Sequence, residues 1–243
     1  MAALIGIEGP NLDLILHSPG GSAEAVAQIV QYLRPKYVDL RVIIPQHAMS
    51  AATMLACAAN EIIMGRHSAL GPIDPQLTMP SRSGVISVSA QSILDEFASA
   101  QTSINRGDNP LLWIERVRAY APGFLVHCQQ LIKLSNDLVT RWLADYMFSD
   151  LPRPDAETKA DEIASWLSDN NHFFTHGRPI CYDLALSKGL RVTRLEDDQG
   201  LQERVLTVFH ATISTFHRTT CIKIVENHMG KGSYSALEQL PDP

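Results

Sequence analysis

The sequence lacks the features that mark several classes of protein. The net charge is −6 and no run rich in lysine and arginine occurs, so a nucleic-acid partner would find no basic surface to bind. No apolar run reaches the roughly 18 residues that a membrane-spanning helix needs. No Walker motif is present, so the chain is not an ATPase. We therefore expect a protein without an integral membrane segment and without a nucleic-acid partner.

Cysteine is scarce, and no pattern of metal ligands is present. Only His172 and His176, among nine histidines, stand four residues apart, and they lack the glutamate of a zinc-peptidase helix. The four cysteines are widely spaced and form no CxxC pair: Cys57, Cys128, Cys181 and Cys221. We expect reduced thiols in a cytoplasmic protein that holds no metal and needs no cofactor.

What is present is the composition of an ordinary globular protein, with 45% apolar and 19% charged residues in a chain of 243. Short apolar segments at residues 12–16, 40–45 and 61–65 are typical of buried strands. Helical patterns separate them: one begins at Ser22, a plausible N-cap, and an alanine-rich one covers residues 49–59. This alternation predicts βαβ units, and hence an α/β fold with a largely parallel sheet.

The second half of the chain is predicted to be mostly helical. The polar segment 149–158 contains two prolines and is expected to be a flexible connection. Further helices are predicted over residues 91–104, 122–147, 181–188 and 201–228. We expect residues 1–200 to form one α/β domain, and residues 201–243 to form a C-terminal helix and tail. The wide apolar coverage of that last helix indicates packing on its own domain or on a neighbouring subunit.

Two turns between a strand and a helix carry the residue types that chemistry needs. The first reads His-Ser-Pro-Gly-Gly-Ser over residues 17–22. Its glycines, Gly20 and Gly21, leave backbone N–H groups uncovered, which suits a phosphate or the oxyanion of an acyl transfer. In the second turn, Ser50 stands where a strand meets a helix. Ser50 is either the N-cap of that helix or a nucleophile with the N–H of Ala51 beside it.

Together, the two turns resemble those of the Clp protease proteolytic subunit and the signal peptide peptidase A family. In those families an SPGG or TPGG turn supplies an oxyanion donor, and a later AxSA or AASG turn carries the nucleophilic serine. Here Gly21 and Ser50 are 29 residues apart. The resemblance implies a Clp protease/crotonase-like fold of stacked ββα units with a C-terminal helical arm. It also implies a serine endopeptidase with Ser50 as nucleophile, an oxyanion hole from Gly20, Gly21 and Ala51, a peptide or protein substrate, and a homo-oligomer.

The resemblance extends along the chain. Residues 60–65 and 68–76 are similar to the strand and loop that follow the nucleophile helix in that fold. Residues 176–180 and 209–227 are similar to the serine dehydrogenase proteinase branch of the group. The fold normally has a strand and a helix before the SPGG strand, whereas this sequence begins almost at that strand. We therefore expect either a missing N-terminal segment or the loss of the first unit.

The resemblance does not identify the base that activates Ser50. A serine hydroxyl is a weak nucleophile until a neighbouring group takes its proton. The position of the Clp histidine falls on Asp74, which stands 24 residues after Ser50. Signal peptide peptidase A uses a lysine, but no lysine lies between Lys36 and Lys133 here. Both standard bases are therefore absent from their standard places.

Three candidate bases remain. The favoured one is His176, near the position of the Clp-type acid, with Asp74 orienting it in a Ser–His–Asp triad. Each partner would then stand on the other's usual loop. The second is Lys133, which would have to be buried and neutral. The third is His47, three residues before Ser50. Each residue also has an ordinary structural explanation, as a turn aspartate, a loop histidine or an exposed helix lysine.

Two other functions stay open on the sequence alone. A crotonase-like acyl-CoA enzyme would use a similar oxyanion hole on a thioester, with Asp74 as its base. A catalytically inactive oligomeric scaffold would explain why both standard bases are missing.

Overall fold

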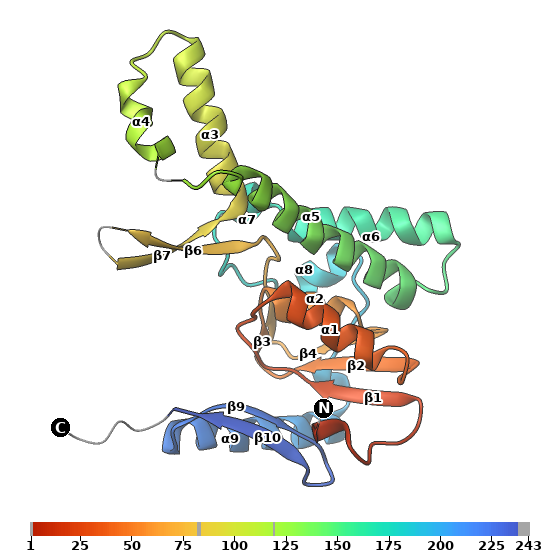
Figure 1. The fold of residues 1–243 in the computed structure, drawn as a ribbon. Helices are drawn as coiled ribbons and strands as arrows, with labels where there is room; N and C mark the ends of the chain where they lie inside the picture. The colour runs from red at the N-terminus through yellow and green to blue at the C-terminus, as the bar shows by residue number, and fades with distance from the viewer. Residues whose placement is uncertain (1, 82–83, 119, 238–243) are drawn as a thin grey trace, which may run out of the picture.

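The structure is a computed structural model that describes residues 2–81, 84–118 and 120–237. Its centre is a four-stranded parallel sheet with the strand order β1–β2–β4–β8 (Figure 1). These strands are β1 (Asn11–Ile15), β2 (Asp39–Ile44), β4 (Glu61–Met64) and β8 (Val192–Arg194). The predicted α/β fold with a parallel sheet is confirmed.

Both faces of this sheet are covered, as apolar parallel strands require. On one face lie α1 (Ala23–Leu33) and α2 (Ala51–Cys57), and every residue of α2 is buried. On the other face, Ile43 of β2 packs in a smaller cluster with Val205 of α9 (Gln199–Arg218). In Figure 1, α1 and α2 lie above β1 and β2, and α9 lies below them. The small side chains of α2 let it lie close to the sheet, and this fixes the position of the turn that precedes it.

A second, smaller ladder joins four segments that are far apart in the sequence. Its two short parallel strands are β3 (His47–Ala48) and β5 (Ala69–Leu70). An isolated bridge adds Ser18 beside Ala48 on one side, and another adds Ile180 antiparallel to Leu70 on the other. Most of the candidate site residues predicted from the sequence closely follow or precede these four segments. The ladder therefore gathers the SPGG turn, the Ser50 turn and the loops of Asp74 and His176.

Helices make up most of the chain between residues 124 and 187. The helix α5 (Phe124–Trp142) continues through a π-helical turn (Leu143–Met147) and packs along α6 (Arg153–Leu167). The prediction of a flexible connection over residues 149–158 is wrong from Arg153 onward, because prolines are tolerated in the first turn of a helix. Shorter elements complete this part and the N-terminus: α7 (Asn170–Phe173), α8 (Tyr182–Ser187), and the 3-10 turns Ala2–Leu4 and Leu195–Asp197.

A hairpin and two helices extend away from the sheet (Figure 1). The hairpin consists of β6 (Gln76–Ser81) and β7 (Gly84–Ser89), which pair antiparallel. The helix α3 (Ala90–Asn105) agrees with the prediction for residues 91–104, whereas α4 (Leu111–Arg118) was not predicted. The hairpin begins two residues after Asp74, so it starts directly at the candidate site.

The C-terminal arm differs from the prediction of one helix over residues 201–228. The helix α9 ends at Arg218, and an antiparallel hairpin of β9 (Cys221–Glu226) and β10 (Gly232–Ala236) follows. Thr219 has extended backbone angles, and three of the six residues of β9 are β-branched, which favours a strand. The predicted tail falls partly on residues 238–243, which lie outside the described residues. None of the described helices combines the length and apolarity needed to cross a membrane.

Candidate active site

Ser50 stands in a strained turn between β3 and α2. Its backbone angles, φ 54° and ψ −121°, are rarely adopted by residues other than glycine. The Ser50 side chain makes no capping hydrogen bond to α2, whereas Ser22 does cap α1 by accepting from the N–H of Ala25 at 3.1 Å. The N-cap explanation therefore fits Ser22 and does not fit Ser50. Among the described residues the Ser50 hydroxyl has no hydrogen-bond partner, and it stands at a sharp strand-to-helix turn, as in a nucleophile elbow.

The SPGG turn lies directly against Ser50. The Ser18 N–H donates to the His47 carbonyl at 3.0 Å, and the Met49 N–H donates to the Ser18 carbonyl at 3.0 Å. Gly20 has φ +109°, and a β-carbon on it would lie 2.7 Å from the Met49 carbonyl oxygen and 2.8 Å from the Ser50 β-carbon. Only glycine fits this position, because any side chain would collide with the turn that carries Ser50.

The three predicted oxyanion donors are not equivalent. The Gly20 N–H already donates to Ser18 Oγ at 3.1 Å. Within the part of the chain that the structure describes, the N–H groups of Gly21 and Ala51 have no acceptor. Ala51 is the first residue of α2, where helical N–H groups have no partner inside the helix. Gly21 and Ala51 are therefore the two donors that remain available beside Ser50.

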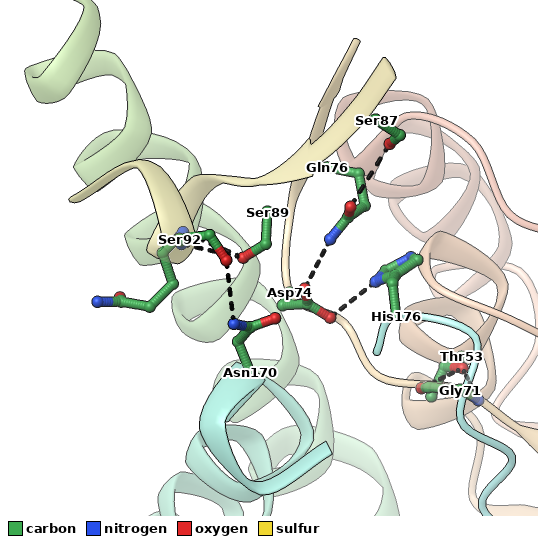
Figure 2. Close-up of polar contacts among 10 residues, drawn as sticks. Thr53, Gly71, Asp74, Gln76, Ser87, Ser89, Ser92, Asn170 and His176 are labelled. Carbon is green, nitrogen blue, oxygen red and sulfur yellow. Dashed lines mark hydrogen bonds and ion pairs between the residues drawn. The ribbon is translucent and has the colours of Figure 1, made fainter. Parts of the chain in front are cut away.

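Asp74 and His176 are hydrogen-bonded although 102 residues separate them in the sequence. His176 Nδ1 lies 2.7 Å from Asp74 Oδ1 (Figure 2). The Asp74 side chain is only 3% exposed, and that of His176 is 26% exposed. A carboxylate can only accept, so the contact places a proton on Nδ1 and leaves Nε2 of a neutral imidazole as an acceptor. This is the orientation in which a histidine acts as a base.

The Asp74 loop is attached to the helix that Ser50 begins. Thr53 Oγ1 on α2 lies 2.7 Å from the Ala48 carbonyl oxygen and 2.9 Å from that of Gly71, and it accepts from the Gly71 N–H at 3.0 Å (Figure 2). A β-carbon on Gly71 would lie 2.5 Å from the terminal carbon of Met49. These contacts hold the loop against the segment on either side of Ser50.

Backbone strain is found at two points, and both flank this site. Among the described residues, Ser50 and Phe174 are the only non-glycine residues with positive φ, 54° and 63°. Phe174 precedes His176 by two residues and shapes the turn on which His176 lies. Strained backbone that persists in a folded protein is concentrated at functional sites.

The structure does not support the two other candidate bases. Lys133 is 75% exposed on α5 and forms an ion pair with Asp137 at 2.7 Å, so the burial that a neutral lysine requires is absent. The prediction of Lys133 as a candidate base is therefore wrong, because Lys133 is an exposed lysine on a helix. The ring of His47 lies 4.1 Å from that of His17, between centroids, and the His17 ring contacts Phe209 of α9 at 5.0 Å. Burial lowers the pKa of His47, and its contact with the His17 ring fits a structural role.

One residue of the site was missed by the sequence reasoning. Gln76 Nε2 donates to Asp74 Oδ2 at 2.6 Å, whereas His176 contacts the other oxygen of this carboxylate (Figure 2). Its only sequence signal is a position two residues after Asp74. Elsewhere in the described ranges, no three His, Cys, Asp or Glu side chains are grouped so that they could hold a metal ion.

In comparison with known proteins, the first part of the chain matches a family model. Residues 5–104 match the model of the ClpP-like SDH-type serine proteinases. This stretch contains the SPGG turn, Ser50 and Asp74 but not His176. The predicted resemblance to serine dehydrogenase proteinases is confirmed over these residues.

Two curated relatives come from the archaeon Methanocaldococcus jannaschii, and both are uncharacterized proteins. MJ0137 is 29% identical over 197 residues, which cover 81% of this chain and 57% of the relative. MJ1495 is 47% identical over 66 residues, which cover 27% of this chain and 23% of the relative. The matched segments thus span less than two thirds of the length of either relative.

Proposed function

We propose that this chain, whose residues 5–104 match the ClpP-like SDH-type serine proteinases, is a serine peptidase with Ser50 as its nucleophile. In this proposal His176 is the general base and Asp74 orients it. The observation that carries the assignment is the 2.7 Å contact between His176 Nδ1 and the buried Asp74 carboxylate. The family match supports the peptidase class, and this geometry supports the roles of the residues.

The reaction proceeds through an acyl-enzyme. Ser50 Oγ attacks the carbonyl carbon of the scissile bond while its proton passes to His176 Nε2. The oxyanion that forms accepts hydrogen bonds from the N–H groups of Gly21 and Ala51. The C–N bond then breaks, and the imidazolium of His176 gives its proton to the leaving amine. Water, deprotonated by His176, attacks the acyl carbon and releases Ser50. Asp74 stabilises the imidazolium in both halves of the reaction.

The two alternative functions fit the site less well. An acyl-CoA enzyme with Asp74 as base needs that carboxylate to face the substrate. Both Asp74 oxygens are instead engaged, one by His176 and the other by Gln76, and the side chain is buried. An inactive scaffold has no use for a strained Ser50 or for a buried carboxylate–imidazole pair, since each lowers stability unless it serves a function.

We further propose that the substrate is an extended peptide or protein and that the chain forms a homo-oligomer. Exposed apolar side chains on the C-terminal hairpin, among them Ile222, Val225 and Tyr234, support a subunit contact. Multi-angle light scattering at micromolar concentration is expected to give a multiple of the mass of one chain. A single-chain mass over the whole concentration range would contradict the assembly.

The test of the peptidase is covalent labelling by a fluorophosphonate, read by intact mass. The wild-type protein is expected to gain one adduct, and Ser50→Ala to gain none. His176→Ala is expected to label at least about 100-fold more slowly, because general-base catalysis contributes that much or more. Lys133→Ala and His172→Ala serve as controls and should label at the wild-type rate. A folded wild-type protein that gains no adduct would overturn the proposal.

A further inference from the structure

Asp74 makes a second hydrogen bond that the proposed triad does not require. Gln76 Nε2 donates to Oδ2 at 2.6 Å, while Oδ1 faces His176 Nδ1 at 2.7 Å. Figure 2 shows one contact at each oxygen of the carboxylate, one with Gln76 and one with His176. A carboxylate bonded at both oxygens cannot turn about its Cβ–Cγ bond without losing one partner. The amide of Gln76 thus sets the direction in which Asp74 presents Oδ1.

The other end of the Gln76 amide is tied to the neighbouring strand. Ser87 Oγ on β7 lies 3.4 Å from Gln76 Oε1 (Figure 2). Gln76 pairs with Ser89 across the hairpin, so Ser87 is its diagonal neighbour on the same face. Since a carboxylate only accepts, the amide must direct its NH₂ group at Asp74 and its oxygen at Ser87. A hydrogen-bonded chain therefore runs from the β6–β7 hairpin through Gln76 and Asp74 to His176.

We propose that Gln76 is a positioning residue, which holds the Asp74 carboxylate toward His176 and connects the β6–β7 hairpin to the base. As far as catalysis is concerned, this inference rests on the proposed role of His176. The contact between Gln76 and Asp74 is between a neutral donor and a carboxylate, so it orients Asp74 without neutralising it. A glutamate at this position would remove the donor and place a second carboxylate beside the first.

Two substitutions separate these effects. Gln76→Leu removes the donor and adds no charge. Gln76→Glu also adds a negative charge near His176, which stabilises the imidazolium and raises its pKa. The chain offers a matched control in Gln91, whose Nε2 donates to Asp95 Oδ1 at 2.8 Å on the exposed side of α3. Gln91→Glu makes the same amide-to-carboxylate change beside a carboxylate, Asp95, that forms no hydrogen bond or ion pair with His176 among the described residues.

The experiment measures two quantities in wild type and the three variants. One is the pH titration of the His176 Cε1–H resonance, assigned with His176→Gln. The other is the pH dependence of fluorophosphonate labelling. For Gln76→Glu, both midpoints should move to higher pH, and the labelling rate at high pH should fall roughly tenfold. Gln76→Leu should also label roughly tenfold more slowly, because small misplacements of a catalytic group are costly. Gln91→Glu should leave both quantities unchanged.

The outcomes distinguish this inference from the proposed function. If Gln76→Glu titrates His176 with the wild-type midpoint, Gln76 does not act on the pair, and the positioning role is overturned whether or not Ser50 is labelled. If the midpoint moves in Gln76→Glu but not in Gln91→Glu, while wild type takes no label, the contact of Gln76 with the Asp74–His176 pair holds and the peptidase proposal falls. Should Gln76→Glu fail to fold, wild-type labelling by a folded Gln76→Leu variant would equally overturn the positioning role.

Discussion

Gly20 lies so close to Ser50 that a β-carbon on Gly20 would stand 2.8 Å from the Ser50 β-carbon. Gly20→Ala must therefore shift the SPGG turn away from the nucleophile and displace Gly21. We expect this variant to lose at least about 2 kcal/mol of unfolding free energy and most fluorophosphonate labelling, since strain at positive φ costs about 1–3 kcal/mol before any collision. Urea denaturation and intact mass measure the two effects.

Gly107 provides the matched control for Gly20. Its φ is +91°, but a β-carbon on it would have no neighbour within 4 Å. Gly107→Ala should therefore show the backbone cost alone, about 1 kcal/mol, with unchanged labelling. If both variants lose equal stability and both are labelled normally, the close approach of Gly20 to Ser50 has no functional consequence.

Ser50 should be a site where activity and stability oppose each other. Its φ of 54° and ψ of −121° suit glycine, so Ser50→Gly should relieve strain of about 1–3 kcal/mol. The greater freedom of glycine in the unfolded chain offsets about 0.5–1 kcal/mol of this gain. A net stabilisation of about 1 kcal/mol in urea denaturation is expected, together with complete loss of labelling. Ser50→Ala should lose labelling without the stabilisation, and equal stability of the two variants would argue against strain.

Stability should fall as the solution becomes more acidic, and His17 and His47 should contribute. Burial lowers the pKa of both imidazoles below the ordinary 6.5, and each ring contacts the other. The unfolded chain therefore binds these protons first as the pH falls through about 6.5. Their contribution to the unfolding free energy is fully present above that pH and is lost as the pH falls toward their lowered values.

Urea midpoints at pH 8 and pH 5.5 measure this loss. His17→Gln should reduce the difference between the two midpoints, because His17 also has a buried Nδ1 without a hydrogen-bond partner among the described residues. The exposed His228 is the control, and His228→Gln should keep the wild-type difference. A difference that is unchanged in His17→Gln would assign the acid sensitivity to other groups.

Thiol reactivity should separate the cysteines by burial. Cys57 is completely buried, and burial raises its pKa to about 12, so almost no thiolate exists at pH 8. Cys181 is exposed at the start of α8. Titration with Ellman's reagent at pH 8 should modify Cys181 within minutes and Cys57 only after unfolding. Peptide mapping identifies the order, and early modification of Cys57 would show that α2 opens readily.

The sequence predicted three strands of the central sheet, β1, β2 and β4, because each is a short apolar segment next to a helical pattern. The fourth strand, β8, has only three residues and was not predicted. The family resemblance also singled out Asp74 and His176, because Asp74 falls at the position of the Clp histidine and His176 lies near that of the Clp-type acid. The predicted range of the last helix, residues 201–228, was too long at its C-terminal end. Residues 221–226 contain three β-branched residues but no period of two, and they directly follow a long helical pattern, so periodicity does not separate this strand from the helix before it.

Other features depend on tertiary contacts that no local pattern records. Gln76 has the composition and spacing of any polar residue at the start of a strand, and its importance follows only from the side chain that it meets. The exposure of Lys133 likewise depends on which face of α5 packs on α6. The helix α4 was missed because it is short and none of its residues is buried, so its apolar residues have no helical periodicity toward a core.

The antiparallel bridge between Leu70 and Ile180 fixes how the Asp74 segment is aligned with the His176 segment. Asp74 stands four residues after one member of the bridge, and His176 stands four residues before the other. Because the two segments run in opposite directions, residues at the same distance in sequence from the bridge lie opposite each other. Inserting or deleting one residue on one side only would slide a partner by about 3.3 Å along its strand direction, more than the length of their hydrogen bond. The lengths of these two loops are therefore constrained as a pair, and a change in one is tolerable only with a compensating change in the other.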